Sequence, residues 1–259
     1  MALVSPSDFK ASGRTHNWES TLLHEIAHVV TLMGSNYRIP RWLTEGMSVY
    51  MQGDTRSIRD IPFKTMVEHG PLPELATWNR EFTRPEYAWR VPAAYEAAGL
   101  FVTWLVAEHG PAVLGRLVRL YGEGKTTAEV FQGAIGKELP AVDAWFHERL
   151  QAYADTVQCP VMEDPRQVEK WEKLYEANPE NTLASLRLLR IYRQHNPEKA
   201  LALAEALTRR AQKLSDQGNA GAGDRAFALA GVIGAGAALR GNAPDKAARL
   251  SKLTLLVDP

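Results

Sequence analysis

Apolar residues recur every three to four positions along most of this chain of 259 residues, a spacing that predicts helices rather than strands. The first helix is predicted from Asn17, a suitable N-cap, to Gly34, a suitable C-terminal stop. After Pro40, the stretch "RWLTEGMSVYMQ" predicts a second helix. Prolines interrupt the region from Gly53 to about Val91, so we expect that region to be rich in loops.

Four more helices are predicted in the first part of the chain. They cover "PAAYEAAGLFVTWLVAEHG", "PAVLGRLVRLYG", "TTAEVFQGAI" and "LPAVDAWFHERLQAYA". The one indication of a strand is the short apolar piece "MALVS" at the start. The pattern therefore predicts a mainly α fold.

A boundary is predicted at "QCPVMEDP", and the helical segments beyond it are interrupted by proline and glycine. Two of them, "NPEKALALAEAL" and "APDKAARLSKLTL", share residues at Pro197/Pro244, Lys199/Lys246, Ala200/Ala247 and Leu203/Leu250. Such an echo is typical of stacked helical hairpins. Its offset exceeds the roughly 34 residues of a tetratricopeptide repeat, but the glycine-rich insert "SDQGNAGAGD" can account for the excess. We predict tetratricopeptide-like repeats over residues 165–259, with a plain helical bundle as the alternative.

Composition narrows the classes of partner and site. Thirty basic and thirty acidic residues balance, which favours neither nucleic acid nor an anionic membrane as a partner. No run of about 18 apolar residues is present, so we expect no membrane span. A single cysteine, Cys159, excludes a disulfide framework and a zinc site made of several thiolates. Any metal must therefore be bound by His, Asp or Glu.

The stretch "LLHEIAHVV" has the spacing of a metal site. His24 and His28 are four residues apart, so on a helix both imidazoles face one point, where they can bind zinc. Glu25 projects close to the same point and could take a proton from a metal-bound water. The alternative is an amphipathic helix that buries two histidines. In our interpretation the apolar residues of the stretch anchor the helix, namely Leu22, Leu23, Ile26, Val29 and Val30.

A third ligand decides between these readings. The metzincin pattern fails, because Thr31 and Gly34 stand where it requires Gly and His. Glu45, on the next predicted helix, follows His28 after sixteen intervening residues, and an antiparallel helix pair would bring it back to the histidines. Such a set of three leaves one zinc position open, as a catalytic site requires. The alternative for Glu45 is an exposed acidic residue early in a helix.

These motifs resemble a known family. "NWESTLLHEIAHVVTL" followed by "RIPRWLTEGMSVY" resembles the gluzincin metallopeptidases, in particular the bacterial peptidase MA-like domains that precede tetratricopeptide repeats. "AAYEAAGLFVTWLVAEHG" and "FQGAIGKELPAVDAWFHERL" resemble the segments that close that domain. The similarity runs from Phe9 to Tyr153, and we expect the domain to span residues 1–157. It implies a zincin-like helical metallopeptidase core.

The resemblance also implies roles for individual residues. Zn²⁺ would be the cofactor, with His24, His28 and Glu45 as its ligands and Glu25 as general base and acid. Gluzincins often use a tyrosine or histidine as a donor to the oxyanion of the tetrahedral intermediate. Tyr95, at the start of a predicted helix, is the candidate, with a packed aromatic side chain as the alternative.

Two departures from the family pattern affect these expectations. Val49 stands where some gluzincins place an aspartate that orients a ligand histidine, and Ser48, Asn17 or a backbone carbonyl would have to replace it. The family also places a β-sheet before the motif helix, but only 23 residues precede His24. We expect a fragment from which the N-terminal sheet is mostly absent. The start lacks a signal peptide, so the compartment stays open, although a longer parent protein would plausibly be exported to the periplasm or outside the cell.

Three functions are compatible with these features. The leading one is a zinc-dependent peptidase that acts on a peptide or protein substrate and binds a protein partner through its repeats. The alternative is a non-catalytic scaffold with a structural or vestigial zinc site. The third is a metal-free helical domain.

Overall fold

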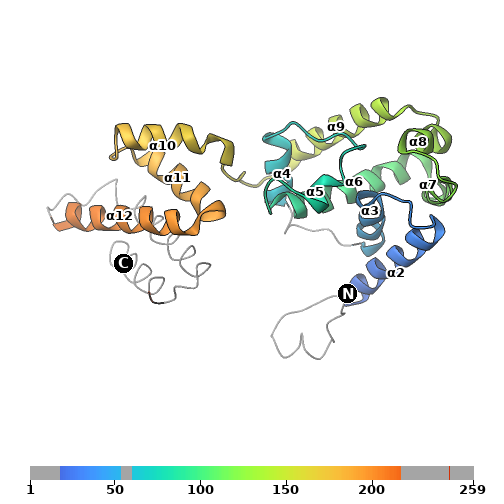
Figure 1. Cartoon of the computed structure of the whole chain (residues 1–259), viewed down its shortest axis with the longest axis horizontal. Coiled ribbons are helices and arrows are strands. Elements are labelled where there is room, and N and C mark those ends of the chain that lie inside the picture. Colours follow the sequence, from blue (N-terminus) through green and yellow to red (C-terminus); the bar gives the residue numbers. More distant parts are fainter. Residues whose placement is uncertain (1–17, 54–59, 217–244, 246–259) are drawn as a thin grey trace. The chain divides into compact units, whose positions relative to one another are not determined.

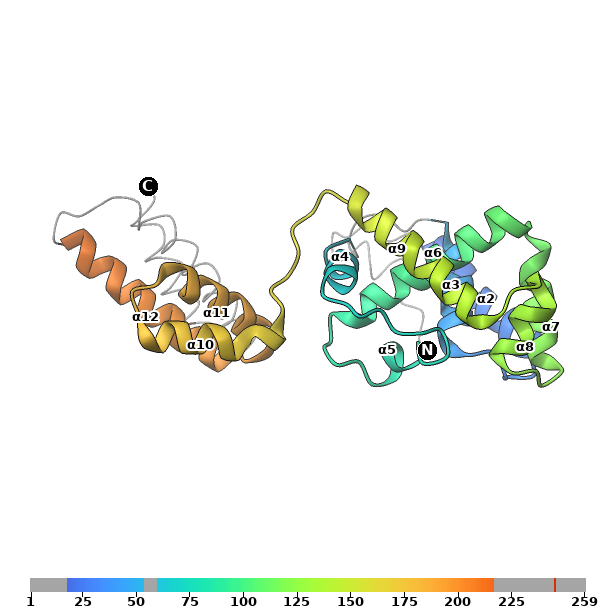
Figure 2. The same cartoon turned by 90° about the horizontal axis from the view of Figure 1, so that it is seen from above.

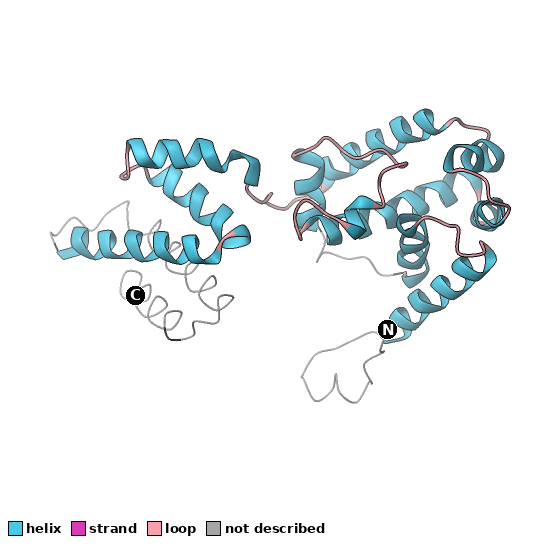
Figure 3. Ribbon diagram, in the orientation of Figure 1, coloured by secondary structure: helices cyan, strands magenta, loops and turns pink. Residues whose placement is uncertain are grey.

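The computed structural model describes residues 18–53, 60–216 and 245, and every regular element in these ranges is a helix (Figures 1 and 3). The expected mainly α fold is confirmed. The chain divides into two compact units, unit 1 (Met1–Val161) and unit 2 (Met162–Pro259). The predicted strand "MALVS" and the predicted N-cap Asn17 lie outside the described residues.

The described part of unit 1 is a succession of helices. They are α2 (Trp18–Gly34), α3 (Arg41–Gln52), α4 (Asp60–Glu68), α5 (Arg80–Thr83), α6 (Arg90–His109), α7 (Ala112–Gly122), α8 (Thr127–Ile135) and α9 (Leu139–Thr156). The expectation of loops between Gly53 and Val91 is wrong in part, because α4 and α5 lie there. Pro62 falls in the first turn of α4, where proline breaks no helical hydrogen bond.

Helix α6 is the central helix of unit 1 and packs against α3, α4, α5 and α7 (Figure 2). The residue Phe101 of α6 is fully buried in the core. Four aromatic rings lie edge-on to Phe101 at centroid distances of 5.0–5.8 Å: Trp42, Phe131, Trp145 and Phe146. These rings join α3, α8 and α9 to α6, which gives α3 a fixed support.

Helices α3 and α6 approach so closely that glycine is needed at the contact. A Cβ on Gly46 would lie 2.5 Å from the carbonyl oxygen of Ala98, and a Cβ on Gly99 would lie 2.5 Å from Cγ1 of Val49. Neither distance is sterically allowed, so a side chain at Gly46 would force the backbones apart and one at Gly99 would force Val49 to move. The contact therefore sets α3 at a close distance from the middle of α6.

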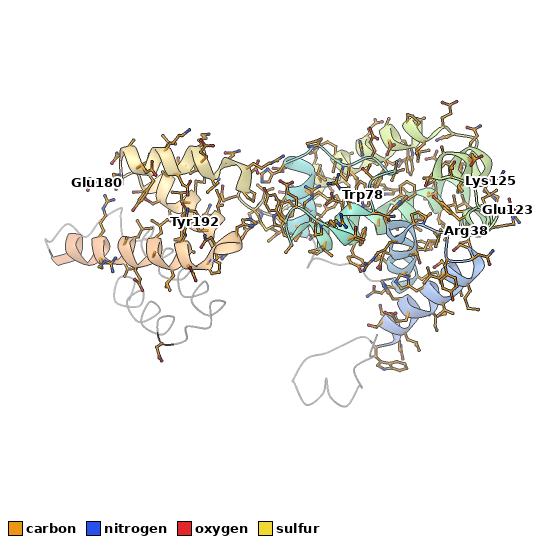
Figure 4. The ribbon with its side chains drawn as sticks, viewed as in Figure 1. Arg38, Trp78, Glu123, Lys125, Glu180 and Tyr192 are labelled. Carbon is orange, nitrogen blue, oxygen red and sulfur yellow. The ribbon has the colours of Figure 1, made fainter. Side chains whose placement is uncertain are left out.

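A short connection joins α2 and α3 into an antiparallel pair. Asn36 and Tyr37 turn the chain with φ angles of 52° and 60°, in the left-handed region. Arg38 donates from Nη1 to the carbonyl oxygen of Gly122 at 2.7 Å, and Figure 4 shows it beside Glu123 at the end of α7. The connection is thereby attached to α7, which fixes the direction of the helix pair.

Within the described ranges, no single helix is long and apolar enough to cross a membrane. Helices α6 and α7 reach the required length and hydropathy only as a pair, bent by 113°.

In unit 2 the described elements are a 3₁₀ turn (Pro165–Gln167), α10 (Val168–Ala177), α11 (Thr182–His195) and α12 (Pro197–Asp216). Helix α10 packs on α11 and α11 packs on α12, around buried residues such as Leu189 and Ala204. Tyr192, labelled in Figure 4, donates its hydroxyl to Glu172 at 2.5 Å. The second copy of the sequence echo, apart from Asp245, lies outside the described residues, so the tetratricopeptide-like repeat stays a prediction.

Candidate metal centre

The α2–α3 pair brings three potential metal ligands together. His24 Nε2 lies 3.2 Å from His28 Nε2, and the Oε2 atom of Glu45 lies 3.2 Å from His28 Nε2 and 3.6 Å from His24 Nε2. No other group of at least three His, Cys, Asp or Glu in the described part of the chain has the geometry to hold a metal ion. The expected convergence of these side chains is therefore present in the structure.

The register of the two helices explains this convergence. Ser20 donates its hydroxyl to the carbonyl oxygen of Gln52 at 2.9 Å, and the Nδ1 atom of His28 lies 3.0 Å from the hydroxyl of Thr44. The two helices therefore run antiparallel in step, with Ser20 beside Gln52 and His28 beside Thr44. His24 is halfway between Ser20 and His28, so this register places it level with Ser48.

The three donor atoms have the spacing that zinc requires. Zinc binds imidazole nitrogen and carboxylate oxygen at about 2.0–2.2 Å, so donors at the corners of a tetrahedron lie about 3.3–3.6 Å apart. The observed separations of 3.2, 3.2 and 3.6 Å lie within about 0.1 Å of this range. Three protein ligands also leave one tetrahedral position for another molecule. The residues present therefore fit a catalytic type of zinc site.

The two carboxylate oxygens of Glu45 have different neighbours. Oε2 faces the histidines, whereas Oε1 accepts a hydrogen bond from Nε of Arg41 at 3.2 Å. Burial of this carboxyl opposes its ionisation, but hydrogen bonds to His24, His28 and Arg41 outweigh burial and hold its pKa well below the usual value. Glu45 is therefore a carboxylate at neutral pH, and Arg41 directs one oxygen to the ligand point.

Tyr95, in the second turn of α6, completes the inner surface of the centre. Its hydroxyl makes hydrogen bonds with Glu45 and Arg41, and its ring packs edge-on against Phe82 at 5.0 Å. Burial raises the pKa of Tyr95, and the negative charge of Glu45 raises it further. The phenol therefore stays protonated near neutral pH and can donate a hydrogen bond. The ring of Tyr95 packs and its hydroxyl faces Glu45 and Arg41, and its role as a donor to the substrate stays a prediction.

Glu25 follows His24 on α2 and is half-buried. Among the described residues it has no hydrogen bond or ion pair, in contrast to Glu45. A carboxylate without a protein partner can accept a proton from a water molecule beside it.

The interpretation that the apolar residues of "LLHEIAHVV" anchor the helix is wrong. Five of them are 37–62% exposed: Leu22, Leu23, Ile26, Val29 and Val30. Helix α2 packs on α3 and α7, and its buried positions are Ser20, Ala27 and Thr31. Its anchoring face is thus the same face that carries the histidines, and the apolar residues project away from it.

The contact between the Nδ1 atom of His28 and the hydroxyl of Thr44 is one that sequence reasoning did not identify. The position of Thr44 directly before Glu45 in "WLTEG" was the available signal. Val49, where an aspartate was considered, is fully buried against Gly99, so a charged side chain would be desolvated there. Ser48 lies opposite His24, but within the described residues the Ser48 hydroxyl and the His24 Nδ1 atom are buried without hydrogen bonds.

Sequence comparison identifies the family. A sequence model described as the Peptidase MA superfamily matches residues 12–156, which is more than half of the chain and contains the whole centre. Comparisons with curated proteins and with solved structures give no match. On the strength of the superfamily match, the chain belongs to the Peptidase MA superfamily.

Proposed function

We propose that this protein is a zinc-dependent peptidase of gluzincin type, in which His24, His28 and Glu45 bind zinc and Glu25 acts as general base and acid. The observation that carries the proposal is the mutual spacing of the three donor atoms, at 3.2, 3.2 and 3.6 Å. Membership of a superfamily that is typically zinc-dependent supports it.

The residues of the centre divide the chemistry among them. Zinc bound there would act as a Lewis acid that polarises a carbonyl and lowers the pKa of a water molecule. Glu25 takes a proton from the water whose oxygen attacks the carbonyl carbon of the substrate. It then gives that proton to the amide nitrogen as the C–N bond breaks, so that an acid and an amine leave.

Tyr95 would stabilise the negative charge that develops on the carbonyl oxygen of the substrate. Its hydroxyl is protonated, lies beside Glu45 and is supported by the guanidinium of Arg41. A donor placed before the reaction costs no reorganisation during it, and its removal typically lowers kcat by about 10²–10³-fold.

Unit 2 would bind a protein partner or part of the substrate. The support for this role is the order in which its described helices pack, with each on its neighbour in sequence, as in helical repeats.

The function is tested with Glu25→Gln in the full chain. We expect this variant to retain one equivalent of zinc and to lose hydrolysis of a fluorogenic peptide library, because the amide binds no proton. Glu19→Gln, an exposed glutamate on the same helix, is the control and should keep both properties. Zinc binding without hydrolysis of any peptide by the unmodified chain would support the scaffold alternative and contradict the proposal.

A further inference from the structure

A row of buried hydrogen bonds leads away from His28 on the side opposite the ligand point. His28 Nδ1 lies 3.0 Å from Oγ1 of Thr44, which lies 2.6 Å from Oγ1 of Thr31. Thr31 in turn donates to the carbonyl oxygen of Ala27 at 2.8 Å. Thr31 and Thr44 are 6% and 4% exposed, so solvent does not compete for these bonds.

The number of hydroxyl protons decides which group donates in each of these hydrogen bonds. A carbonyl oxygen only accepts, so the single hydroxyl proton of Thr31 points to Ala27. The short contact between the two threonines must then use the hydroxyl proton of Thr44. The oxygen of Thr44 is left to accept, and the proton between it and His28 belongs to Nδ1.

The opposite direction would bring two acceptors together. If Thr44 donated to His28, Thr31 would have to donate to Thr44. The Thr31 oxygen would then lie 2.8 Å from the carbonyl oxygen of Ala27 with no proton between them, and its remaining carbonyl contact, with His28, is longer at 3.3 Å. Two buried acceptors at that distance are unfavourable.

We propose that Thr31 and Thr44 are positioning residues that form a one-way hydrogen-bond relay, which holds a proton on Nδ1 of His28 so that Nε2 is the nitrogen that binds metal. The metal part of this inference rests on the proposed zinc site, whereas the proton on Nδ1 does not. The relay belongs to His28 alone, because Nδ1 of His24 is buried without a hydrogen bond to any described residue.

Through the relay, the Thr31 hydroxyl acts on His28 by way of Thr44. Removal of the Thr31 hydroxyl frees the proton of Thr44, which can then rotate and donate to Nδ1 of His28. That donation favours the Nε2–H tautomer, in which the proton occupies the ligand position. A loss of this kind in the outer shell typically lowers metal affinity by about 10–100-fold.

The direct test is the ¹⁵N NMR spectrum of the histidine rings in the metal-free Glu45→Ala chain at a pH where His28 is neutral, because the Glu45 carboxylate 3.2 Å from Nε2 would otherwise hold a proton on that nitrogen. We expect His28 to show one Nδ1–H tautomer, and Thr31→Val and Thr44→Val to shift it toward Nε2–H. An Nε2–H tautomer of His28 in the Glu45→Ala chain, with both threonines in place, would overturn the relay.

Zinc affinity, measured by competition with a chelating dye, provides the second readout. We expect Thr44→Val and Thr31→Val to raise the Kd for zinc about 10–100-fold, and Thr44→Ser to restore it to within about threefold. Thr65→Val is the matched control: Thr65 is a fully buried threonine on α4 whose hydroxyl donates to the carbonyl oxygen of Ile61 at 2.6 Å. Unchanged zinc affinity in both relay variants would also overturn the proposal.

These experiments distinguish a failure of the relay from a failure of the proposed peptidase function. An unmodified chain that binds no zinc would remove the proposed function, and the tautomer measurement would still decide whether the relay exists. Zinc binding that depends on Thr31 and Thr44, without peptide hydrolysis, would leave the relay intact and contradict the peptidase.

Discussion

At the scale of single residues, the carboxylate of Glu45 and the phenol of Tyr95 each have defined neighbours. Glu45 divides its oxygens between Arg41 and the histidines, and Tyr95 contacts both Glu45 and Arg41. Glu25, in contrast, has no hydrogen bond or ion pair in the described part of the chain. This division separates the residues that hold the ligand set from the one that can exchange a proton.

Tyr95→Phe tests the donor role within this division. We expect kcat for peptide hydrolysis to fall about 10²–10³-fold with little change in KM, because the hydrogen bond strengthens only as charge develops on the substrate oxygen. Steady-state kinetics measure both constants. Tyr153→Phe, which changes a tyrosine packed against Phe63, should keep wild-type kcat. A Tyr95→Phe variant with wild-type kcat would reduce Tyr95 to a packing role.

Ser48→Ala tests whether a hydroxyl without a partner contributes to the site. The Ser48 hydroxyl is buried without a hydrogen bond to the residues described, so its removal should raise the free energy of unfolding by up to about 1 kcal/mol. Denaturant unfolding measures this change. A loss of more than about 1 kcal/mol would show that Ser48 has a partner, and His24 would be the first candidate.

At the scale of elements, the site depends on how closely α3 approaches α6. The two glycines at the contact let the helices approach, and this approach places Tyr95 beside Glu45. Helix α2 then joins α3 through a register that aligns His28 with Thr44. The centre is therefore a product of three helices, although its potential ligands come from only two.

Gly46→Ala should disturb this arrangement. The added Cβ would lie 2.5 Å from the carbonyl oxygen of Ala98, a backbone atom that cannot rotate away, so we expect a loss of about 1–3 kcal/mol of unfolding free energy and weaker zinc binding. Gly115→Ala is the control, because a Cβ at Gly115 on α7 meets nothing within 4 Å. That variant should gain about 0.5–1 kcal/mol from helix propensity. Equal stabilities for the two variants would contradict the close contact.

The sequence predicts the elements of unit 1 better than it predicts their packing. The helical period located α2, α3 and α6 to α9 to within a few residues, and the His–Glu spacing located the ligand set. The helical period did not reveal α4, because Pro62 in its first turn resembled a helix break. It also failed for the apolar side of α2, because periodicity shows that a helix has two faces but does not show which face packs. Arg41 and Thr44 escaped notice because their roles depend on inter-helix register.

At the scale of the whole molecule, each unit has a core of its own. The core of unit 1 is built around Phe101 and the core of unit 2 around Leu189, and the described residues of the centre all belong to unit 1. We therefore expect a shortened chain of residues 1–161 to bind zinc with the affinity of the full chain, within about threefold. Competition titration with a chelating dye checks this, and circular dichroism confirms folding of the shortened chain. A folded 1–161 chain that has lost zinc binding would show that unit 2 completes the centre.

The central claim is that His24, His28 and Glu45 together bind zinc. X-ray absorption at the zinc edge of the zinc-loaded full chain tests it most directly, because the scattering distinguishes imidazole, carboxylate and sulfur ligands. We predict one zinc per chain with two imidazole nitrogens at about 2.0–2.1 Å and oxygen ligands at about 2.0–2.2 Å, of which one is lost in Glu45→Ala. A zinc ion with sulfur at about 2.3 Å, or an unchanged spectrum in Glu45→Ala, would contradict the account.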